Sequence, residues 1–220
     1  MTRPLLLGHR GARASRHIPE NTLASFELCL QQGCDGFEFD VRRSADGQAV
    51  VCHDPSVRGM VVVKTPAAVL GLPMLGEVLR LFGTRAFLDI ELKVAGLEQE
   101  IGTLLREHPP QKEYVVSSFK PEVLTAIHAL DATIPLGFIC ERRDEVDRWR
   151  QLPIKWVIPQ LELVDPTFVR QVQAGGKKAM VWTVNREDHM RRFQELGVGA
   201  IISDETESVV RVLGVGKQAQ

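Results

Sequence analysis

Short apolar segments recur along this 220-residue chain, and a segment of helical character follows each of them. Alternating strands and helices indicate parallel strands with helical crossovers, and eight such units predict a closed barrel. We therefore predict an α/β fold of the (β/α)8 TIM-barrel type. An open doubly wound sheet fits less well, because no glycine-rich phosphate loop follows the first strand. The predicted strands begin at Leu5, Phe37, Phe87, Tyr114, Ile134, Lys155, Lys178 and Ala200.

The chain is compact for a barrel of this kind, which typically has about 250 residues. No linker or low-complexity stretch divides it, so we expect a single domain over residues 1–220. The first helix carries apolar residues at helical spacing, with Asn21 as its predicted N-cap and Gly33 as its predicted end. A helix is also predicted over Arg143–Gln151, whereas Val57–Leu75 has no sustained period and receives no element.

Composition excludes several classes of protein. Lysine and arginine number 27 and aspartate and glutamate 28, so the net charge is −1 and nucleic acid is not an expected partner. No apolar run approaches the roughly 20 residues of a transmembrane segment. The four cysteines, at 29, 34, 52 and 140, lack the spacing of a zinc site, so we expect reduced thiols and a cytoplasmic location. Homo-oligomer formation stays open.

Acidic residues alternate with apolar ones in two of the predicted strands. In Phe37–Val41, Glu38 and Asp40 share one face, and in Ala86–Lys93 the residues Asp89, Glu91 and Lys93 do the same. Active sites of such barrels lie at the carboxyl ends of the strands. Glu38, Asp40 and Glu91 would then form a hard oxygen site suited to Mg²⁺ or Ca²⁺. The alternative is a set of buried ion pairs with Arg10, Lys93 and Arg42. Asp89 lies deeper in the predicted barrel, so we expect it to support the site and not to ligate the metal.

Two histidines are expected near these carboxylates. His9 ends the first strand, and an Asp46-Gly47 hairpin turn returns the chain to His53. A single histidine would favour a hydrogen-bonded rim position, but two beside a carboxylate cluster favour acid–base chemistry. Zinc ligation is disfavoured, because the first strand ends in His-Arg-Gly and not in His-x-His. Arg10 and Lys93 add cations, which together with a divalent metal suggest a phosphate-bearing substrate.

An ordered set of motifs extends over nearly the whole chain: Gly8–Ala12, Pro19–Thr22, Glu38–Val41, Asp46-Gly47, His53-Asp54, Glu91–Lys93, Ser117–Phe119, Val181–Asn185 and Gly199–Asp204. Together these motifs resemble the glycerophosphodiester phosphodiesterase family. The resemblance implies a metal-dependent hydrolase that converts glycerophosphodiesters to an alcohol and sn-glycerol 3-phosphate, in lipid and glycerol metabolism.

The resemblance also implies roles for individual residues. One divalent cation, Mg²⁺ or Ca²⁺, would polarise the phosphoryl oxygens while the histidines act as general acid and base on a small-molecule glycerophosphodiester. The implied metal ligands are Glu38, Asp40 and Glu91, the catalytic residues His9 and His53, the phosphate contacts Arg10 and Lys93, and the supporting residues Glu20, Phe119 and Trp182.

One segment departs from the family pattern. After the second strand and His53-Asp54, members carry a longer polar insertion, whereas Val57–Leu72 is short and apolar. Packing against the barrel edge is the plainer interpretation of Met60–Val63. An apolar contact for an acyl chain would instead favour a lysophospholipase D-type activity on lyso-lipids. The alternative outside enzymes is a non-catalytic barrel that binds a phosphorylated ligand.

Overall fold

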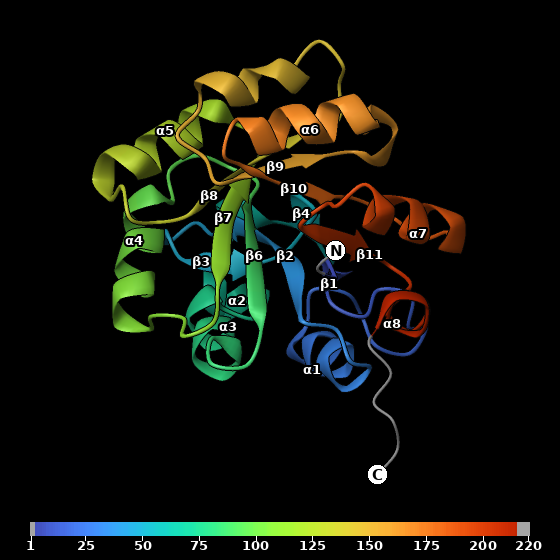
Figure 1. Cartoon of the computed structure of the whole chain (residues 1–220). Helices are drawn as coiled ribbons and strands as arrows, with labels where there is room; N and C mark the ends of the chain where they lie inside the picture. The colour runs from blue at the N-terminus through green and yellow to red at the C-terminus, as the bar shows by residue number, and fades with distance from the viewer. Residues whose placement is uncertain (1–2, 215–220) are drawn as a thin grey trace.

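The computed structural model describes residues 3–214 and shows strands in a closed ring with helices around it (Figure 1). The strand order is β1-β11-β10-β9-β8-β7-β6-β2, and β1 also pairs with β2, which closes the ring. All pairs in this ring are parallel, so the predicted TIM barrel is confirmed. The barrel strands are β1 (Leu5–His9), β2 (Gly36–Arg43), β6 (Phe87–Leu92), β7 (Tyr114–Ser118), β8 (Leu136–Cys140), β9 (Trp156–Pro159), β10 (Lys178–Val181) and β11 (Ala200–Ser203).

α-Helices cover the outside of the barrel in six of the seven crossovers between the described barrel strands, and α8 follows the last strand. The fifth crossover differs from the prediction, because the α-helix expected over Arg143–Gln151 is a 3₁₀ helix, η2 (Val146–Gln151). Only Trp149 of this helix is buried, so no continuous apolar face is present to stabilise an α-helix. A further 3₁₀ helix, η3, spans Leu161–Leu163. The α-helices on the barrel are α1 (Leu23–Gln31), α3 (Leu75–Phe82), α4 (Glu98–Glu107), α5 (Pro121–Leu130), α6 (Pro166–Ala174), α7 (Glu187–Glu195) and α8 (Thr206–Leu213).

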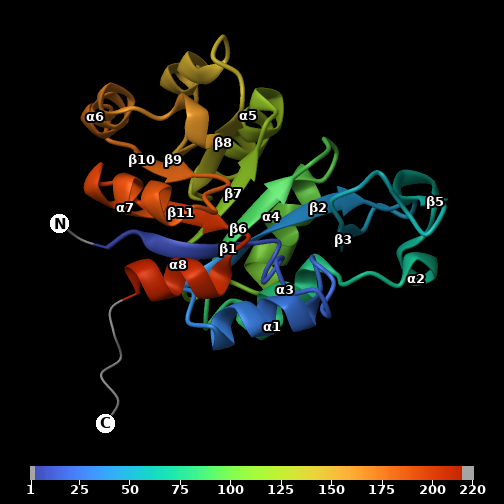
Figure 2. The ribbon, with the colours of Figure 1, turned by 90° about the vertical axis from the view of Figure 1, so that its right-hand side faces the viewer.

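The second crossover contains the extra elements of the fold. β3 (Ala49–Val51) returns antiparallel to β2 after a turn at Asp46-Gly47, where Gly47 has φ +83°, so the predicted hairpin is confirmed. The segment without a sequence period then forms a small hairpin and two short helices, which lie at the far right of Figure 2. These elements are β4 (Ser56–Val57), β5 (Met60–Val61), η1 (Val62–Lys64) and α2 (Ala67–Leu70).

Alternate residues of the barrel strands face opposite sides. On the outer face of β2, Phe37 stacks on Phe26 of α1 with 4.2 Å between ring centroids, and both side chains are fully buried. Inside the barrel, Leu7, Phe87 and Met180 belong to a second buried apolar cluster. The interior is therefore filled by side chains, as is usual for this fold.

The first helix begins one residue later than predicted. Thr22 is the N-cap, and its hydroxyl oxygen accepts a hydrogen bond from the backbone N–H of Ser25 at 3.2 Å. Asn21, the predicted cap, has φ +56° and directs its side chain elsewhere. Within residues 3–214, no helix is both long and apolar enough to cross a bilayer.

Candidate active site

Strand register brings the predicted carboxylates together. In the β2–β6 pair, Glu38 lies beside Asp89 and Asp40 beside Glu91, so four acidic residues occupy neighbouring positions on one face. One carboxylate oxygen from each of Glu38, Asp40 and Glu91 lies within 4.8 Å of the others, and all three residues are buried. In the described part of the chain, Oε1 of Glu38 has no hydrogen-bond partner. A buried carboxylate oxygen left unpaired among other carboxylates fits a cation ligand.

The two carboxylates of β2 are perturbed in opposite directions. Burial, together with the charges of Asp40 and Glu91, raises the pKa of Glu38 well above its usual value. Burial also acts to raise the pKa of Asp40, but the nearby cations Lys93 and Arg10 outweigh it and lower that pKa. Asp40 is therefore the most readily ionised of the three carboxylates. A divalent cation would favour the ionised form of the others.

Asp89 lies on the same face of β6 as Glu91, two residues earlier in the strand, and is fully buried. Burial raises the pKa of Asp89 to about 7, although a hydrogen bond at 2.5 Å from the Ser117 hydroxyl to Oδ1 acts in the other direction. Asp89 lies outside the three-carboxylate group. The supporting role expected for Asp89 stays a prediction.

Arg10 and Lys93 both contact the carboxylates. Lys93 Nζ lies 2.7 Å from Glu91 Oε1 and 3.3 Å from Asp40 Oδ1, while Arg10 Nε lies 3.3 Å from Asp40 Oδ2. Arg42 is not part of this cluster, because its Nε donates to the backbone oxygen of His53 at 2.7 Å. The ion-pair interpretation thus holds for Arg10 and Lys93, and it is compatible with phosphate binding by the same two side chains.

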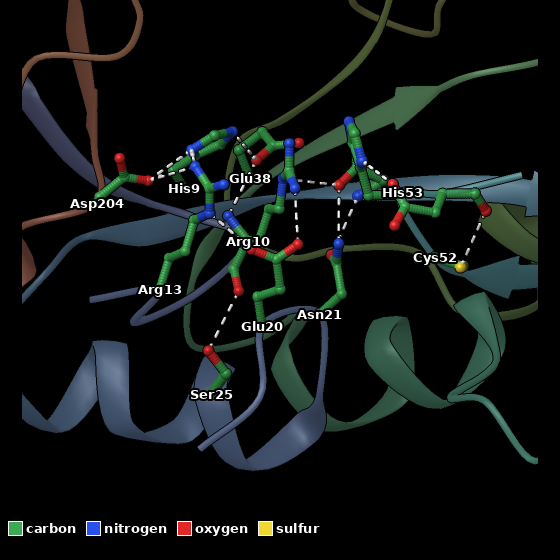
Figure 3. A network of polar contacts seen from close by, with 12 residues as sticks. His9, Arg10, Arg13, Glu20, Asn21, Ser25, Glu38, Cys52, His53 and Asp204 are labelled. Atoms are coloured by element: carbon green, nitrogen blue, oxygen red, sulfur yellow. Dashed lines mark hydrogen bonds and ion pairs between the residues drawn. The ribbon is translucent and has the colours of Figure 1, made fainter. Parts of the chain in front are cut away.

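Arg10 contacts other residues of its own loop, between β1 and α1, and Figure 3 shows Glu20 beside it. Glu20 accepts hydrogen bonds from Arg10 and from Arg13, both at 2.6 Å. Asn21 donates its amide to Asp40 at 2.8 Å. Glu20 therefore lies beside the site and contacts Arg10, whereas the role of Asn21 at Asp40 has no counterpart in the sequence-based prediction.

Both predicted histidines reach the same cavity, which has a volume of about 580 Å³. His9 Nδ1 lies 2.7 Å from Asp204 Oδ1, and His53 Nδ1 lies 2.7 Å from Asp54 Oδ1. Burial acts to raise the pKa of Asp204, but three neighbours lower it. The hydrogen bond and charge of His9, the hydrogen bond from Asn185 and the charge of Arg13 together hold this pKa well below the usual range. Asp204 has no assigned role in the sequence-based prediction. A role for Asp204 could have been found from the expected closure of the barrel, because pairing of the first strand with the last brings His9 and Asp204 side by side.

The rest of the cavity has an apolar wall and a second group of charged side chains, Lys120, Glu141, Arg142 and Glu145. Phe119 and Trp182 meet edge to face with 5.7 Å between ring centroids, and Trp182 Nε1 donates to the backbone oxygen of Ile158 at 3.0 Å. Trp182 lies one residue beyond the end of β10. Carboxylates and cations thus occupy one side of the cavity, and an apolar wall suited to carbon atoms occupies another.

Comparison with known proteins agrees with this geometry. The model of the glycerophosphoryl diester phosphodiesterase family matches residues 9–81 and 81–208. The chain belongs to this family. It is 28% identical over 242 residues to a glycerophosphodiester phosphodiesterase of Caldanaerobacter subterraneus subsp. tengcongensis, covering 96% of this chain and 98% of that protein. As a glycerophosphodiester phosphodiesterase it is a phosphoric diester hydrolase, so the non-catalytic alternative is set aside.

Solved structures show the same barrel. A phosphodiesterase from Oleispira antarctica, solved in complex with its product sn-glycerol 3-phosphate, has a TM-score of 0.84 and 28% identity, covering 97% of this chain and 98% of that one. A glycerophosphodiester phosphodiesterase from Thermotoga maritima has a TM-score of 0.84 and 22% identity, covering 96% and 99%. The similarity to the Thermotoga maritima structure shows a shared fold.

Proposed function

We propose that this enzyme hydrolyses glycerophosphodiesters to an alcohol and sn-glycerol 3-phosphate in a reaction that depends on one divalent cation, Mg²⁺ or Ca²⁺. The observation that carries the proposal is a group of three buried carboxylates, two of which line one cavity together with two cations and two histidines. The Oleispira antarctica relative supports the product, because it was solved with sn-glycerol 3-phosphate bound. The free, buried cysteines fit the reducing cytoplasm expected for this chain.

The donor set fits a hard divalent cation. Glu38, Asp40 and Glu91 would hold it, since all three offer oxygen ligands within 4.8 Å of one another. A bound cation would supply polarisation of the phosphoryl oxygens. Arg10 and Lys93 then bind the phosphate, because each already lies against the carboxylates and has several donors to share.

The two histidines carry the proton transfers. One accepts the proton of the attacking hydroxyl, the glycerol 2-hydroxyl of the substrate itself, and the other donates a proton to the leaving alcohol. Opening of the resulting cyclic phosphate by water reverses these roles. His9 and His53 suit this exchange because both line the cavity that contains Glu38 and Lys93.

Release of sn-glycerol 3-phosphate tests the proposal. The substrates are glycerophosphocholine and glycerophosphoglycerol, each with Mg²⁺, with Ca²⁺ and with EDTA, for the wild type, Glu38→Ala and Glu107→Ala. Glu107 is an exposed residue at the end of α4 and serves as the matched control. We expect metal-dependent release that is lost in Glu38→Ala and kept in Glu107→Ala. Release that survives both chelation and Glu38→Ala would contradict the proposal.

A second candidate substrate class is lysophospholipids. Val61, Val63 and Val69 are large apolar side chains that are exposed, and the first two line a largely apolar hollow of about 190 Å³ together with Pro55, two residues from His53. An acyl chain would bury this surface. Faster turnover of lysophosphatidylcholine than of glycerophosphocholine, reversed in Val61→Ser/Val63→Ser, would favour this class. If the wild type and the variant prefer lysophosphatidylcholine to the same degree, the two valines do not bind the acyl chain.

A further inference from the structure

We propose that Asp204 is the positioning residue of His9, which it holds in the Nδ1–H tautomer with Nε2 turned toward the carboxylate cluster. The inference rests on the proposed function, since it assigns a partner to one of the two histidines of that site. It also makes a statement about the resting protein that does not depend on turnover.

The register of three strands places His9 between two carboxylates. Gly8 lies beside Ser203 in the β1–β11 pair, so His9 and Asp204 are the next residues past that ladder. On the other side of β1, His9 lies beside Glu38 of β2. The ring spans this gap, with Nδ1 at 2.7 Å from Asp204 Oδ1 and Nε2 at 3.9 Å from Glu38 Oε2. The ring nitrogen that faces the cluster is therefore Nε2.

Asp204 is itself held in place by its neighbours, of which Figure 3 shows His9 and Arg13. Asn185 donates its amide to Asp204 Oδ2 at 2.8 Å and accepts the backbone N–H of Asp204 at 2.9 Å. Arg13 donates to Asp204 Oδ1 at 3.1 Å. These contacts fix the carboxylate in one orientation, and only 20% of its side chain is exposed. A carboxylate fixed in this way can determine the orientation of the imidazole.

The other histidine lacks a comparable arrangement. His53 Nδ1 contacts Asp54 at the same distance, 2.7 Å, but the Asp54 side chain is 72% exposed. Asp54 also follows His53 directly in the chain, so the contact is local. An exposed pair of this kind contributes little to orientation because water competes for both groups. The two histidines are thus unequal, and the structure gives a fixed partner to His9.

The tautomer of His9 follows from the hydrogen-bonding groups around Nδ1, one a donor and one an acceptor. Arg13 Nη1 lies 3.3 Å from His9 Nδ1, and guanidinium groups only donate, so this contact would need a lone pair on Nδ1. The carboxylate of Asp204 only accepts and is closer, at 2.7 Å, so it requires a proton on Nδ1. Arg13 already donates to Glu20 and to Asp204. Nδ1 therefore carries the proton, and the lone pair of neutral His9 is on Nε2.

Three variants of the full chain test this assignment. Asp204→Asn keeps the size of the side chain but offers an amide N–H that can donate to Nδ1, which favours the wrong tautomer. Asp204→Glu keeps the carboxylate and is the conservative rescue. Asp188→Asn is the matched control, because Asp188 is exposed on α7 and pairs with Arg186. The measurements are kcat and KM for glycerophosphocholine, the Mg²⁺ affinity, and the His9 tautomer from ¹⁵N chemical shifts, assigned with His9→Gln.

We expect wild-type His9 to show the Nδ1–H tautomer and Asp204→Asn to shift it toward Nε2–H. We also expect kcat to fall about 10²–10⁴-fold in Asp204→Asn, with KM and Mg²⁺ affinity unchanged and partial recovery in Asp204→Glu. Unchanged kcat in Asp204→Asn, or the Nε2–H tautomer in the wild type, would overturn the inference. A wild type without turnover would contradict the proposed function instead, and the tautomer would still decide the question of Asp204.

Discussion

Asn21 and Asp40 are joined by two hydrogen bonds, one in each direction. The Asn21 amide donates to Asp40 Oδ2 at 2.8 Å, and the backbone N–H of Asp40 donates to Asn21 Oδ1 at 3.3 Å. Asn21 makes these contacts from a left-handed backbone conformation, φ +56°, which asparagine tolerates better than most residues. The loop before α1 is therefore attached directly to the most strongly ionised carboxylate of the cluster.

Replacing Asn21 is expected to weaken metal binding. Loss of the amide in Asn21→Ala removes a partner that orients Asp40, and such partners typically contribute about 10–100-fold to metal affinity. Asn21→Gly is the matched variant, because glycine adopts a positive φ without strain. We expect both variants to bind Mg²⁺ more weakly by titration calorimetry, and Asn21→Gly to melt at the higher temperature. Wild-type Mg²⁺ affinity in either variant would contradict the role of Asn21.

Removing either cavity histidine is expected to stop turnover without unfolding the protein. A general acid or base contributes about 10²–10⁴-fold to rate, so His9→Ala and His53→Ala should each lose activity on that scale. His128→Ala, in α5 on the barrel exterior, is the control and should keep wild-type kcat. Melting temperatures verify folding. An active His9→Ala/His53→Ala double variant would exclude acid–base catalysis by this pair.

The metal-free protein is expected to lose stability as the pH rises. The pKa of Asp89 is about 7 in the folded protein and about 3.9 in an unfolded chain, so between these values the folded state binds more protons. Its contribution to the free energy of unfolding is full below about pH 4 and disappears as the pH passes 7. In EDTA, the melting temperature should fall from pH 5 to pH 8.

Asp89→Asn isolates the contribution of that carboxyl. The amide stays neutral at every pH, so the melting temperature of the variant should depend less on pH than that of the wild type. Part of the dependence should persist, because burial also raises the pKa of Glu91 and Glu38. Identical pH profiles for wild type and Asp89→Asn would show that Asp89 is ionised in the folded protein.

Phe37 is expected to stabilise the barrel without contributing to the site. Its side chain stacks on Phe26 on the outer face of β2, opposite the inward-facing Glu38. Phe37→Ala should lower the free energy of unfolding by about 3–5 kcal/mol, the usual range for a fully buried phenylalanine. Urea denaturation measures this loss, and Phe37→Leu should lose less. Reduced Mg²⁺ affinity in folded Phe37→Ala would contradict the separation of the two faces.

Elements with a clear periodic pattern were predictable from sequence. The helix Pro121–Leu130 and the strand Ala200–Ser203 have the predicted bounds, because proline begins the helix and a continuous apolar run forms the buried strand. Register also made the convergence of Glu38, Asp40 and Glu91 predictable. Their roles as ligands, and those of the other site residues, stay predictions.

Features that depend on tertiary contacts were not predictable. The segment 57–72 forms its own small core around Val62 and Leu70, which local periodicity does not reveal. Asn21 looks like a helix cap in sequence, yet contact with Asp40 places it in a different conformation and leaves capping to Thr22. Asp204 becomes a partner of His9 only after the barrel closes, across 195 positions of sequence.

Closure of the barrel between β1 and β11 has a consequence for the order in which the protein becomes competent during its synthesis. His9 leaves the ribosome early, whereas Asp204 follows 195 residues later, roughly 10–40 s at ordinary translation rates. A nascent chain that ends before β11 contains every carboxylate of the cluster and both cavity histidines, but it has no strand to close the ring. We therefore expect the closed ring, and with it the contact between His9 and Asp204, to form only once translation has passed residue 204.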